Sequence, residues 1–255
     1  KRMQAESNFN YIIIENSSSD NVPTTVLYRN DLSIGDNCIN GQLTEIKILE
    51  DNASLQAKIN SIEYIPKKEF FTGLAADGET ELNMCILKPK AMIEMENKNE
   101  VPDPKKKFPL LITLYGGPNH QYVTNEFSIS WTSYLVQEGF VVASIDPRGT
   151  AARGEEFRKC TYLKLGQIET KDVVFATYSN FIDKDRVGIW GWSYGGFMSL
   201  LCLSNGADVF STSIAVAPVT NWKYYDTIYT ERYMRTPQEN EGYEFEAPLH
   251  VVDKL

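Results

Sequence analysis

The chain has 255 residues, 42% of them hydrophobic and 23% charged, which is the balance of a globular domain with a packed core. Its formal net charge of −9 argues against a nucleic-acid partner, because phosphate groups are bound by basic surfaces. The longest apolar run, Pro109 to Tyr115, is far shorter than the roughly 20 residues of a membrane-spanning helix, so we expect no membrane span in this segment.

Residues 10–90 carry short apolar runs that alternate with turn-forming residues. The runs are Tyr11–Ile14, Thr25–Tyr28, Ser61–Ile65, Glu69–Thr72 and Glu81–Leu87. The dipeptide Asp77-Gly78 lies between the last two runs. It favours a hairpin, because glycine readily adopts the positive φ that a tight turn needs. This part of the chain is therefore predicted to form antiparallel β structure.

A polar segment with two prolines, residues 91–107, follows and is predicted to be an exposed loop. Beyond it, apolar runs alternate with segments of helical spacing. The predicted strands are 108–115, 140–145, 186–190 and 210–216, and the predicted helices are 130–138, 155–165, 168–181 and 196–203. This alternation predicts an α/β fold with a largely parallel sheet, because neighbouring parallel strands are joined by right-handed helical crossovers.

One segment in this half has the pattern of a nucleophile elbow. Gly191-Trp192-Ser193-Tyr194-Gly195-Gly196 lies between a predicted strand and a predicted helix. In the Gly-x-Ser-x-Gly elbow, a sharp turn holds the serine hydroxyl clear of the sheet, and glycines let the strand and helix approach. We therefore predict that Ser193 is a catalytic nucleophile, with the amide of Tyr194 facing the oxyanion. The alternative is a serine in an ordinary tight turn.

An oxyanion hole needs a second donor, which in this fold comes from the loop after an earlier strand. Here that strand ends in Leu114-Tyr115-Gly116-Gly117-Pro118. The phenol of Tyr115 can donate a hydrogen bond, and the glycines allow the backbone to approach closely. Tyr115 is therefore the candidate second donor, and the alternative is a tyrosine that only ends a strand.

These motifs carry a resemblance to a known family. The elbow, the Tyr115–Pro118 loop and the turn Asp146-Pro147-Arg148-Gly149 resemble motifs of the prolyl oligopeptidase superfamily, in its dipeptidyl peptidase IV branch. The aromatic segment from Val216 to Met234 resembles the S1 wall of that branch. The resemblance implies an α/β-hydrolase domain, a parallel-rich sheet flanked by helices, over residues 61–255 and incomplete at its C-terminus. It implies the last strands of a β-propeller and a return segment over residues 1–60.

The resemblance also implies roles for individual residues. Ser193 would attack the substrate, and Tyr115 and Tyr194 would form the oxyanion hole. A compact aromatic S1 pocket would be shaped by Val219, Trp222, Tyr225, Tyr229 and the Tyr194 ring. Such a pocket suits proline, whose flat and rigid ring stacks on aromatic side chains and loses little entropy. Without the resemblance, the tyrosine stripe would be taken for core packing on a helix.

Two parts of the expected machinery are missing from this sequence. In the family, the aspartate and histidine of the triad lie well downstream of the serine, beyond Leu255 here, so we expect the chain alone to be inactive. His250 does not match the base, and His120 precedes Ser193, although it could line the cleft. The acidic pair that holds the substrate's amino terminus belongs to the propeller, and Glu155-Glu156 is interpreted as a solvated helix surface.

The cysteines do not indicate a metal or redox site. Cys38, Cys85, Cys160 and Cys202 lie far apart, and no two have the spacing of metal ligands or of a redox motif. The sequence leaves disulfide pairing open. We therefore expect no cofactor and no metal.

The resulting hypothesis is a serine peptidase that releases N-terminal dipeptides with a penultimate proline or alanine through an acyl-enzyme on Ser193. Its partner would be a peptide with a free N-terminus, and the resemblance further implies a homodimer and an extracytoplasmic location. One alternative is another serine hydrolase of the superfamily, such as an acylaminoacyl peptidase, an oligopeptidase or an esterase. A second alternative is a non-catalytic binding fragment, because the triad is incomplete here.

Overall fold

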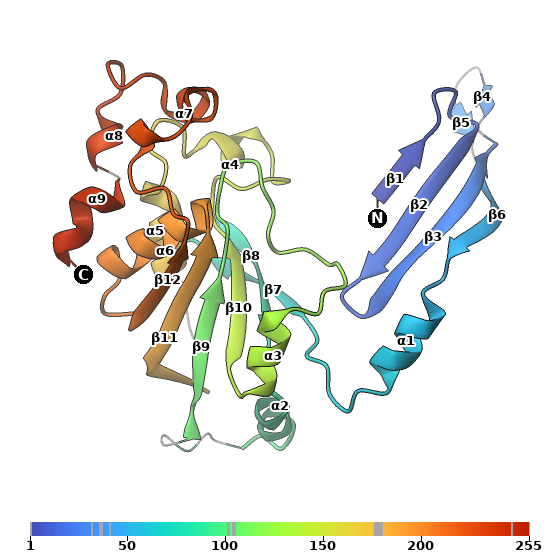
Figure 1. Ribbon diagram of the computed structural model, residues 1–255, viewed down its shortest axis with the longest axis horizontal. Coiled ribbons are helices and arrows are strands. Elements are labelled where there is room, and N and C mark those ends of the chain that lie inside the picture. Colours follow the sequence, from blue (N-terminus) through green and yellow to red (C-terminus); the bar gives the residue numbers. More distant parts are fainter. Residues whose placement is uncertain are drawn as a thin grey trace. The chain divides into compact units, whose positions relative to one another are not determined.

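The computed structural model describes residues 2–31, 33–35, 38–40, 42–100, 103, 106–175, 181–245 and 247–254. The chain forms two compact units (Figure 1). The first consists of residues 1–67 and 125–130, and the second of residues 68–124 and 131–255. The assignment of residues 1–60 to the end of a propeller stays a prediction.

The first unit is built on an antiparallel sheet with the strand order β1-β2-β3-β6. Its strands are β1 (Arg2–Ala5), β2 (Tyr11–Ser18), β3 (Asn21–Asn30) and β6 (Leu43–Glu50). Strands β4 (Ser33–Gly35) and β5 (Cys38–Asn40) pair with each other, and helix α1 (Ala53–Asn60) follows β6. The antiparallel pairing of β2 with β3 joins Ile12 to Tyr28 and Ile14 to Val26. The predicted antiparallel structure is thus confirmed for these strands.

The second unit contains a six-stranded sheet with the order β12-β11-β9-β10-β8-β7. The strands are β7 (Glu69–Leu74), β8 (Glu81–Leu87), β9 (Phe108–Thr113), β10 (Val141–Asp146), β11 (Ile182–Trp192) and β12 (Thr212–Val216). Strands β9 to β12 pair in parallel, whereas β8 is antiparallel to β10 and β7 is antiparallel to β8. The predicted α/β fold with a largely parallel sheet is confirmed.

Helices pack against this sheet and complete its core. The helices are α2 (Lys90–Asn97), α3 (Trp131–Gln137), α4 (Glu155–Lys159), α5 (Gln167–Phe175), α6 (Tyr194–Asn205), α7 (Thr227–Met234), α8 (Gly242–Phe245) and α9 (Pro248–Val251), with 3-10 turns η2 (Trp222–Tyr224) and η3 (Val252–Lys254). Helix α6 packs on β11 and β12, α5 packs on α6, and α3 packs on β10. Val187, Ile189, Phe197 and Cys202 are fully buried, so the inner face of α6 and strand β11 form the centre of the core.

Several element limits differ from those predicted. Ser61–Ile65 forms no strand, and part of the expected loop 91–107 is helix α2. Helix α2 buries Met92 and ends at Asn97. Two residues later, Asn99 has a φ of 52°, and its amide donates a hydrogen bond to the Glu96 carbonyl, which satisfies a free carbonyl at the helix end. The expected helix 155–165 stops at Lys159, and within the expected helix 168–181 residues 176–180 lie outside the described residues.

Candidate active site

Ser193 stands in a strained turn between β11 and α6. Its φ of 58° and ψ of −115° lie in a region that side chains rarely occupy. A Cβ on Gly191 would lie 2.3 Å from the carbonyl carbon and oxygen of Gly195, and a Cβ on Gly195 would lie 2.4 Å from the Leu114 oxygen. Both positions therefore require glycine. The turn has the geometry predicted for a nucleophile elbow.

Backbone hydrogen bonds fix this turn at both ends. The Ser193 amide donates to the Val216 carbonyl on β12 at 2.9 Å, and the Phe197 amide donates to the Ser193 carbonyl at 3.0 Å. The second bond is the first of α6. The amide of Tyr194 lies in the first helical turn, where N–H groups have no acceptor within the helix. This amide and the positive end of the helix dipole can therefore stabilise an anion next to the half-exposed Ser193.

The side chain of Tyr194 points into the core rather than toward solvent. Only 2% of it is exposed, and its hydroxyl donates a 2.7 Å hydrogen bond to Oε1 of Glu169 on α5. The other oxygen of Glu169 accepts the amide of Gly166 at 3.0 Å. Burial raises the pKa of Glu169 to about 7, although these hydrogen bonds favour the ionised form. Burial also raises the pKa of Tyr194 well above its usual value.

Tyr115 lies just beyond β9, next to the start of α6. A Cβ on Gly195 would come within 3.3 Å of the Tyr115 Cα, so the two backbone segments are in contact. The phenol is half-buried, and burial raises its pKa above the usual value, with smaller contributions from Tyr225 and Tyr233. Its ring centroid lies 5.9 Å from that of Tyr194. Tyr115 therefore stays protonated near neutral pH and can donate a hydrogen bond.

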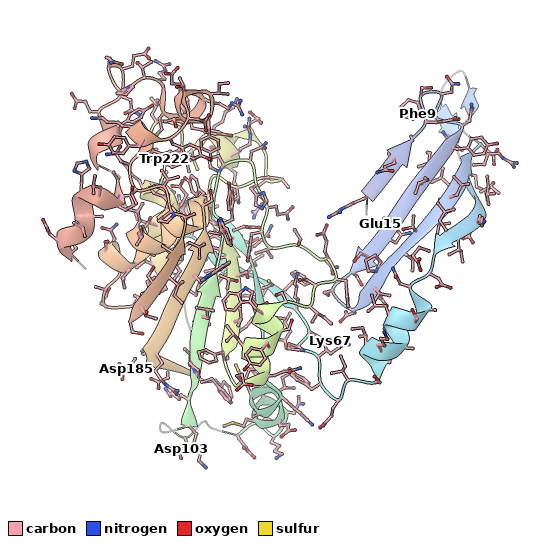
Figure 2. All side chains as sticks on the ribbon, viewed as in Figure 1. Phe9, Glu15, Lys67, Asp103, Asp185 and Trp222 are labelled. Carbon is pink, nitrogen blue, oxygen red and sulfur yellow. The ribbon has the colours of Figure 1, made fainter. Side chains whose placement is uncertain are left out.

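An aromatic cluster continues from Tyr194 through the segment after β12. It consists of Tyr115, Tyr194, Phe197, Trp222, Tyr225, Tyr229 and Tyr233, joined by ring contacts. Trp222 is 1% exposed and lies beyond the carboxyl ends of the parallel strands (Figure 2). It stacks on Tyr229 with centroids 5.9 Å apart and an interplanar angle of 15°. Ligands commonly bind at this end of a parallel sheet.

The structure thus brings together most of the predicted site residues. Ser193 and Tyr194 are consecutive, and ring contacts link Tyr194 to Tyr115 and Trp222. Trp222 in turn contacts the rings of Tyr225 and Tyr229. Val219 is 8% exposed and belongs to the same core as Tyr194 and Trp222. Val219 is therefore placed beside the cluster as a core residue, and its contact with a substrate stays a prediction.

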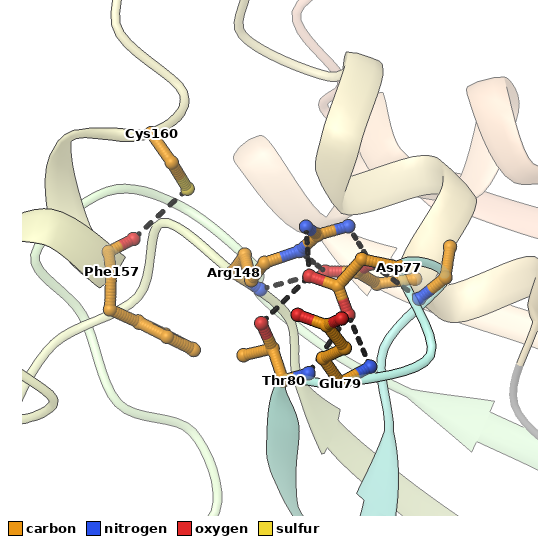
Figure 3. Close-up of polar contacts among 8 residues, drawn as sticks. Asp77, Glu79, Thr80, Arg148, Phe157 and Cys160 are labelled. Atoms are coloured by element: carbon orange, nitrogen blue, oxygen red, sulfur yellow. Dashed lines mark hydrogen bonds and ion pairs between the residues drawn. The ribbon is translucent and has the colours of Figure 1, made fainter.

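The turn Asp146–Gly149 holds the surrounding loops together. The carboxylate of Asp146 accepts the amides of Tyr122 at 2.9 Å and Val123 at 3.0 Å, which fastens the chain that follows the Tyr115 loop. Arg148 donates to Asp172 on α5 and to Asp77 in the β7–β8 hairpin (Figure 3). The turn therefore anchors the loops around the site through hydrogen bonds and does not supply a reacting group.

The histidines occupy different surroundings. His120 is exposed, and its ring contacts that of Tyr115 edge to face, with centroids 4.6 Å apart. His250 on α9 lies 3.4 Å from the side-chain amide of Asn221. The expected solvated surface at Glu155 is confirmed, since this side chain pairs with Arg158 and Lys159 and is largely exposed.

Neither a metal site nor a membrane-spanning helix is found in the described part of the chain. No group of three or more histidine, cysteine, aspartate or glutamate side chains there could hold a metal ion. No described helix is long and apolar enough to span a bilayer. Cys85, Cys160 and Cys202 are free thiols, and burial raises the pKa of all three.

Glu169 was not predicted as a site residue from the sequence. It lies in the segment predicted to be a helix, and the buried side of α5 includes Glu169 and Asp172, two acids three positions apart. Acids on the apolar face of a helix are a signal of buried polar contacts. The partner of Glu169, 25 positions along the chain, appears only in the folded structure.

Comparisons with known proteins agree with this geometry. The sequence pattern of the prolyl oligopeptidase family matches residues 125–255. A prolyl endopeptidase FAP from Bos taurus is 44% identical to this chain, and the match covers 78% of this chain and 25% of the relative. A probable dipeptidyl-aminopeptidase B from Metarhizium robertsii is 47% identical, and the match covers 79% of this chain and 21% of the relative. The chain spans about a quarter of the length of these relatives.

Solved structures extend the similarity to the whole chain. The structure of Porphyromonas gingivalis dipeptidyl peptidase 4 covers 100% of this chain, with 38% identity and a TM-score of 0.86, and is itself covered over 34% of its length. A putative dipeptidyl aminopeptidase IV from Bacteroides ovatus also covers 100% of this chain, with 29% identity and a TM-score of 0.78, over 34% of its own length. The predicted α/β-hydrolase fold, preceded by antiparallel β structure, is confirmed.

Proposed function

The chain belongs to the prolyl oligopeptidase family, and from this premise we propose that the protein containing it is a serine peptidase that releases N-terminal dipeptides with a penultimate proline or alanine. The observation that carries the proposal is the strained conformation of Ser193, directly before Tyr194 and its aromatic cluster. A nucleophile beside a cluster of aromatic rings suits attack on the carbonyl of a proline residue, whose ring can pack against those side chains.

In the proposed reaction, the Ser193 hydroxyl attacks the carbonyl carbon of the penultimate residue. A histidine base, which we place outside residues 1–255, takes the hydroxyl proton and then gives it to the departing amine. The bond from the carbonyl carbon to nitrogen breaks, and an acyl-enzyme forms on Ser193. Water then hydrolyses this ester with the same base, which releases the dipeptide and restores the serine.

Two hydrogen-bond donors stabilise the negative charge that develops on the carbonyl oxygen. The Tyr194 amide lies in the first turn of α6, where N–H groups have no acceptor within the helix, and the Tyr115 phenol, whose pKa is raised by burial, remains a proton donor. Both donors are held on rigid elements, so little reorganisation is needed as the charge forms. We propose that these two groups form the oxyanion hole.

The aromatic cluster would bind the residue before the cleaved bond. Trp222, Tyr225 and Tyr229 form a compact set of ring faces and edges, in which Trp222 contacts Tyr194. A pyrrolidine ring buries apolar area against such faces and loses little conformational entropy when it binds. Val219 would border the same site. Alanine fits in the same space with less contact area, so we propose proline as the preferred residue.

Cleavage inside blocked peptides is the second candidate, because one relative is named a prolyl endopeptidase. The two candidates differ in whether the substrate needs a free amino group. The test compares Gly-Pro and N-acetyl-Gly-Pro anilides with the full-length protein, using Ser193→Ala as the control. Strict preference for the free amine supports the dipeptidyl peptidase, and equal cleavage of the acetylated substrate would contradict it.

The setting of the enzyme is proposed on family resemblance alone. We propose an extracytoplasmic location and a homodimer, with peptides bearing a free N-terminus as the partner molecules. Sedimentation of the full-length protein tests the oligomeric state, and fractionation of the source cells tests the location.

A further inference from the structure

A buried acid that is hydrogen-bonded to the residue after the nucleophile has no part in the proposed reaction. Glu169 is 0% exposed, and in the part of the chain that the structure describes no lysine, arginine or histidine forms an ion pair with it. A carboxylate in such a place is costly, because burial removes the water that stabilises its charge. We therefore expect the hydrogen bonds of Glu169 to have a role that an apolar side chain could not fill.

Both oxygens of this carboxylate are used. Oε2 accepts the amide of Gly166 at 3.0 Å, and Oε1 accepts the hydroxyl of Tyr194 at 2.7 Å. The first bond stops the carboxylate from rotating about its own axis. The second bond then fixes the far end of the Tyr194 ring relative to α5. A methyl or methylene group in place of the carboxylate would hold neither partner.

The helix that carries Glu169 is itself anchored. Asp172, three positions later on α5, accepts hydrogen bonds from the Arg148 side chain at 2.9 and 2.7 Å and from the Ala76 amide at 3.0 Å. The polar side of α5 is therefore tied to the β7–β8 hairpin through Asp172 and to α6 through Glu169. Because α5 is anchored in this way, its bond to Tyr194 can hold the Tyr194 ring in one position.

The Tyr194 ring is the junction of the aromatic cluster. It contacts Tyr115 at 5.9 Å, Trp222 at 5.6 Å and Phe197 at 5.2 Å between ring centroids. Tyr194 also supplies the amide that directly follows the nucleophile. A rotation of this ring would therefore change its contacts with Trp222 and Tyr115 together.

We propose that Glu169 is a positioning residue that sets the orientation of the Tyr194 ring, and through it the preference of the enzyme for proline over alanine before the cleaved bond. This inference rests on the proposed function. A displaced ring would weaken the binding of proline more than that of alanine, because the contacts of proline require an aromatic face at the correct distance and tilt.

The charge of Glu169 depends on the groups around it. On its own helix it faces Asp172, which is paired with Arg148, and on α6 it faces Tyr194 and the thiol of Cys202. Cys160 and Tyr229 also lie within its electrostatic range. Every one of these groups other than the Asp172–Arg148 pair is neutral near pH 7, so no nearby unpaired cation stabilises the carboxylate.

The test uses the full-length protein and five variants: Glu169→Gln, Glu169→Ala, Tyr194→Phe, the double variant that combines Glu169→Gln with Tyr194→Phe, and the control Thr170→Val. Thr170 neighbours Glu169 on α5 and is also buried, so the control perturbs the same helix without touching Tyr194. Active sites are counted by labelling of Ser193 with a fluorophosphonate, and kcat and KM are measured per active site on Gly-Pro and Gly-Ala anilides. The normalisation removes any loss due to misfolded protein.

We expect Glu169→Ala to lower kcat/KM on the Gly-Pro anilide about ten-fold or more, with a smaller loss on Gly-Ala. Glu169→Gln should retain part of the preference, because its amide oxygen can still accept one hydrogen bond. Tyr194→Phe should match Glu169→Gln, and the double variant should lose no more than either single one. The control should keep the wild-type ratio.

An unchanged ratio of proline to alanine cleavage in both Glu169 variants would overturn the inference, and so would an equal change in the Thr170→Val control. If the wild-type protein labels at Ser193 but cleaves neither anilide, the proposed function itself is wrong and the inference falls with it. The two failures are distinguishable, because only the second one affects the wild type.

Discussion

Arg148 donates two side-chain hydrogen bonds to Asp172, one to each carboxylate oxygen, at 2.9 and 2.7 Å. Asp172 is fully buried, and 17% of the Arg148 side chain is exposed. The same guanidinium reaches Asp77 in the β7–β8 hairpin, whose pKa is held well below its usual range by the amides of Thr80 and Glu79 and by Arg148. One arginine thus joins the hairpin, a sheet loop and α5.

The first prediction concerns this pair. Asp172→Asn should lower the free energy of unfolding by about 3 kcal/mol, because it removes the charge from one partner of a buried pair and leaves Arg148 facing a neutral amide. Asp183→Asn is the matched control, since Asp183 pairs with Arg186 near the surface, where 53% of the arginine side chain is exposed. The control should cost less than about 1 kcal/mol. Urea unfolding measures both, and equal losses would contradict the prediction.

The second prediction concerns the nucleophile. Ser193→Ala in the full-length protein should abolish peptide hydrolysis and fluorophosphonate labelling and leave substrate binding intact, because the alanine fits the elbow but has no hydroxyl. Ser204→Ala is the control: Ser204 lies on the same helix and its hydroxyl donates to the Leu200 carbonyl, so the activity of this variant should be unchanged. Hydrolysis that persists in Ser193→Ala would falsify the assignment.

The third prediction tests the second oxyanion donor. Tyr115→Phe keeps the ring in contact with Tyr194 and His120 but removes the phenolic hydrogen. We expect kcat to fall by roughly 10²–10³ with little change in KM, because the donor acts on charge that develops in the transition state. Steady-state kinetics on a Gly-Pro anilide measure this effect. Wild-type kcat in the variant would remove Tyr115 from the oxyanion hole.

The fourth prediction separates two kinds of glycine. Gly191→Ala would place its Cβ 2.3 Å from the Gly195 backbone, so we expect a loss of about 3 kcal/mol or more, or no folded protein. Gly139 ends α3 with a φ of 92°, and a Cβ there would meet nothing within 4 Å. Gly139→Ala should therefore cost only about 1–2 kcal/mol, through backbone strain alone. Urea unfolding compares the two, and similar losses would contradict the close approach at the elbow.

Much of this site could be predicted because its parts are consecutive in sequence. The strand, the glycines and Ser193 form one local motif, and the order of strands and helices indicated the parallel sheet before any contact was known. Helix α2 was missed because its polar surface hides a single buried residue, Met92. A helix with one buried side chain leaves little hydrophobic periodicity to detect.

Contacts between distant segments could not be predicted from one sequence. The bond from Tyr194 to Glu169 and the pairing of Arg148 with Asp172 each join residues more than twenty positions apart, and side-chain orientation decides both. The sequence identified Asp146–Gly149 as a motif, but its structural role emerged only when its partners were seen. Buried acids on α5 were the one local signal available.

The last prediction concerns pH. Glu169 has a pKa of about 7 in the folded protein against 4.5 as its usual value, so folding favours its protonated form. A raised pKa of this kind gives stability that is complete below about pH 4.5 and is lost as the pH rises through about 7. Glu169→Gln stays neutral at every pH. The free energy of unfolding of the wild type relative to Glu169→Gln should therefore fall by about 3 kcal/mol between pH 4 and 8.

Urea unfolding of the full-length wild type and of Glu169→Gln at closely spaced pH values measures this difference. Asp146, whose pKa is also raised by burial, titrates in both proteins, so its contribution cancels in the comparison. A difference that stays constant from pH 4 to 8 would mean that the pKa of Glu169 is the same in the folded and the unfolded protein. Its bonds to Tyr194 and Gly166 would then balance the cost of its burial, because both hydrogen bonds stabilise the carboxylate form.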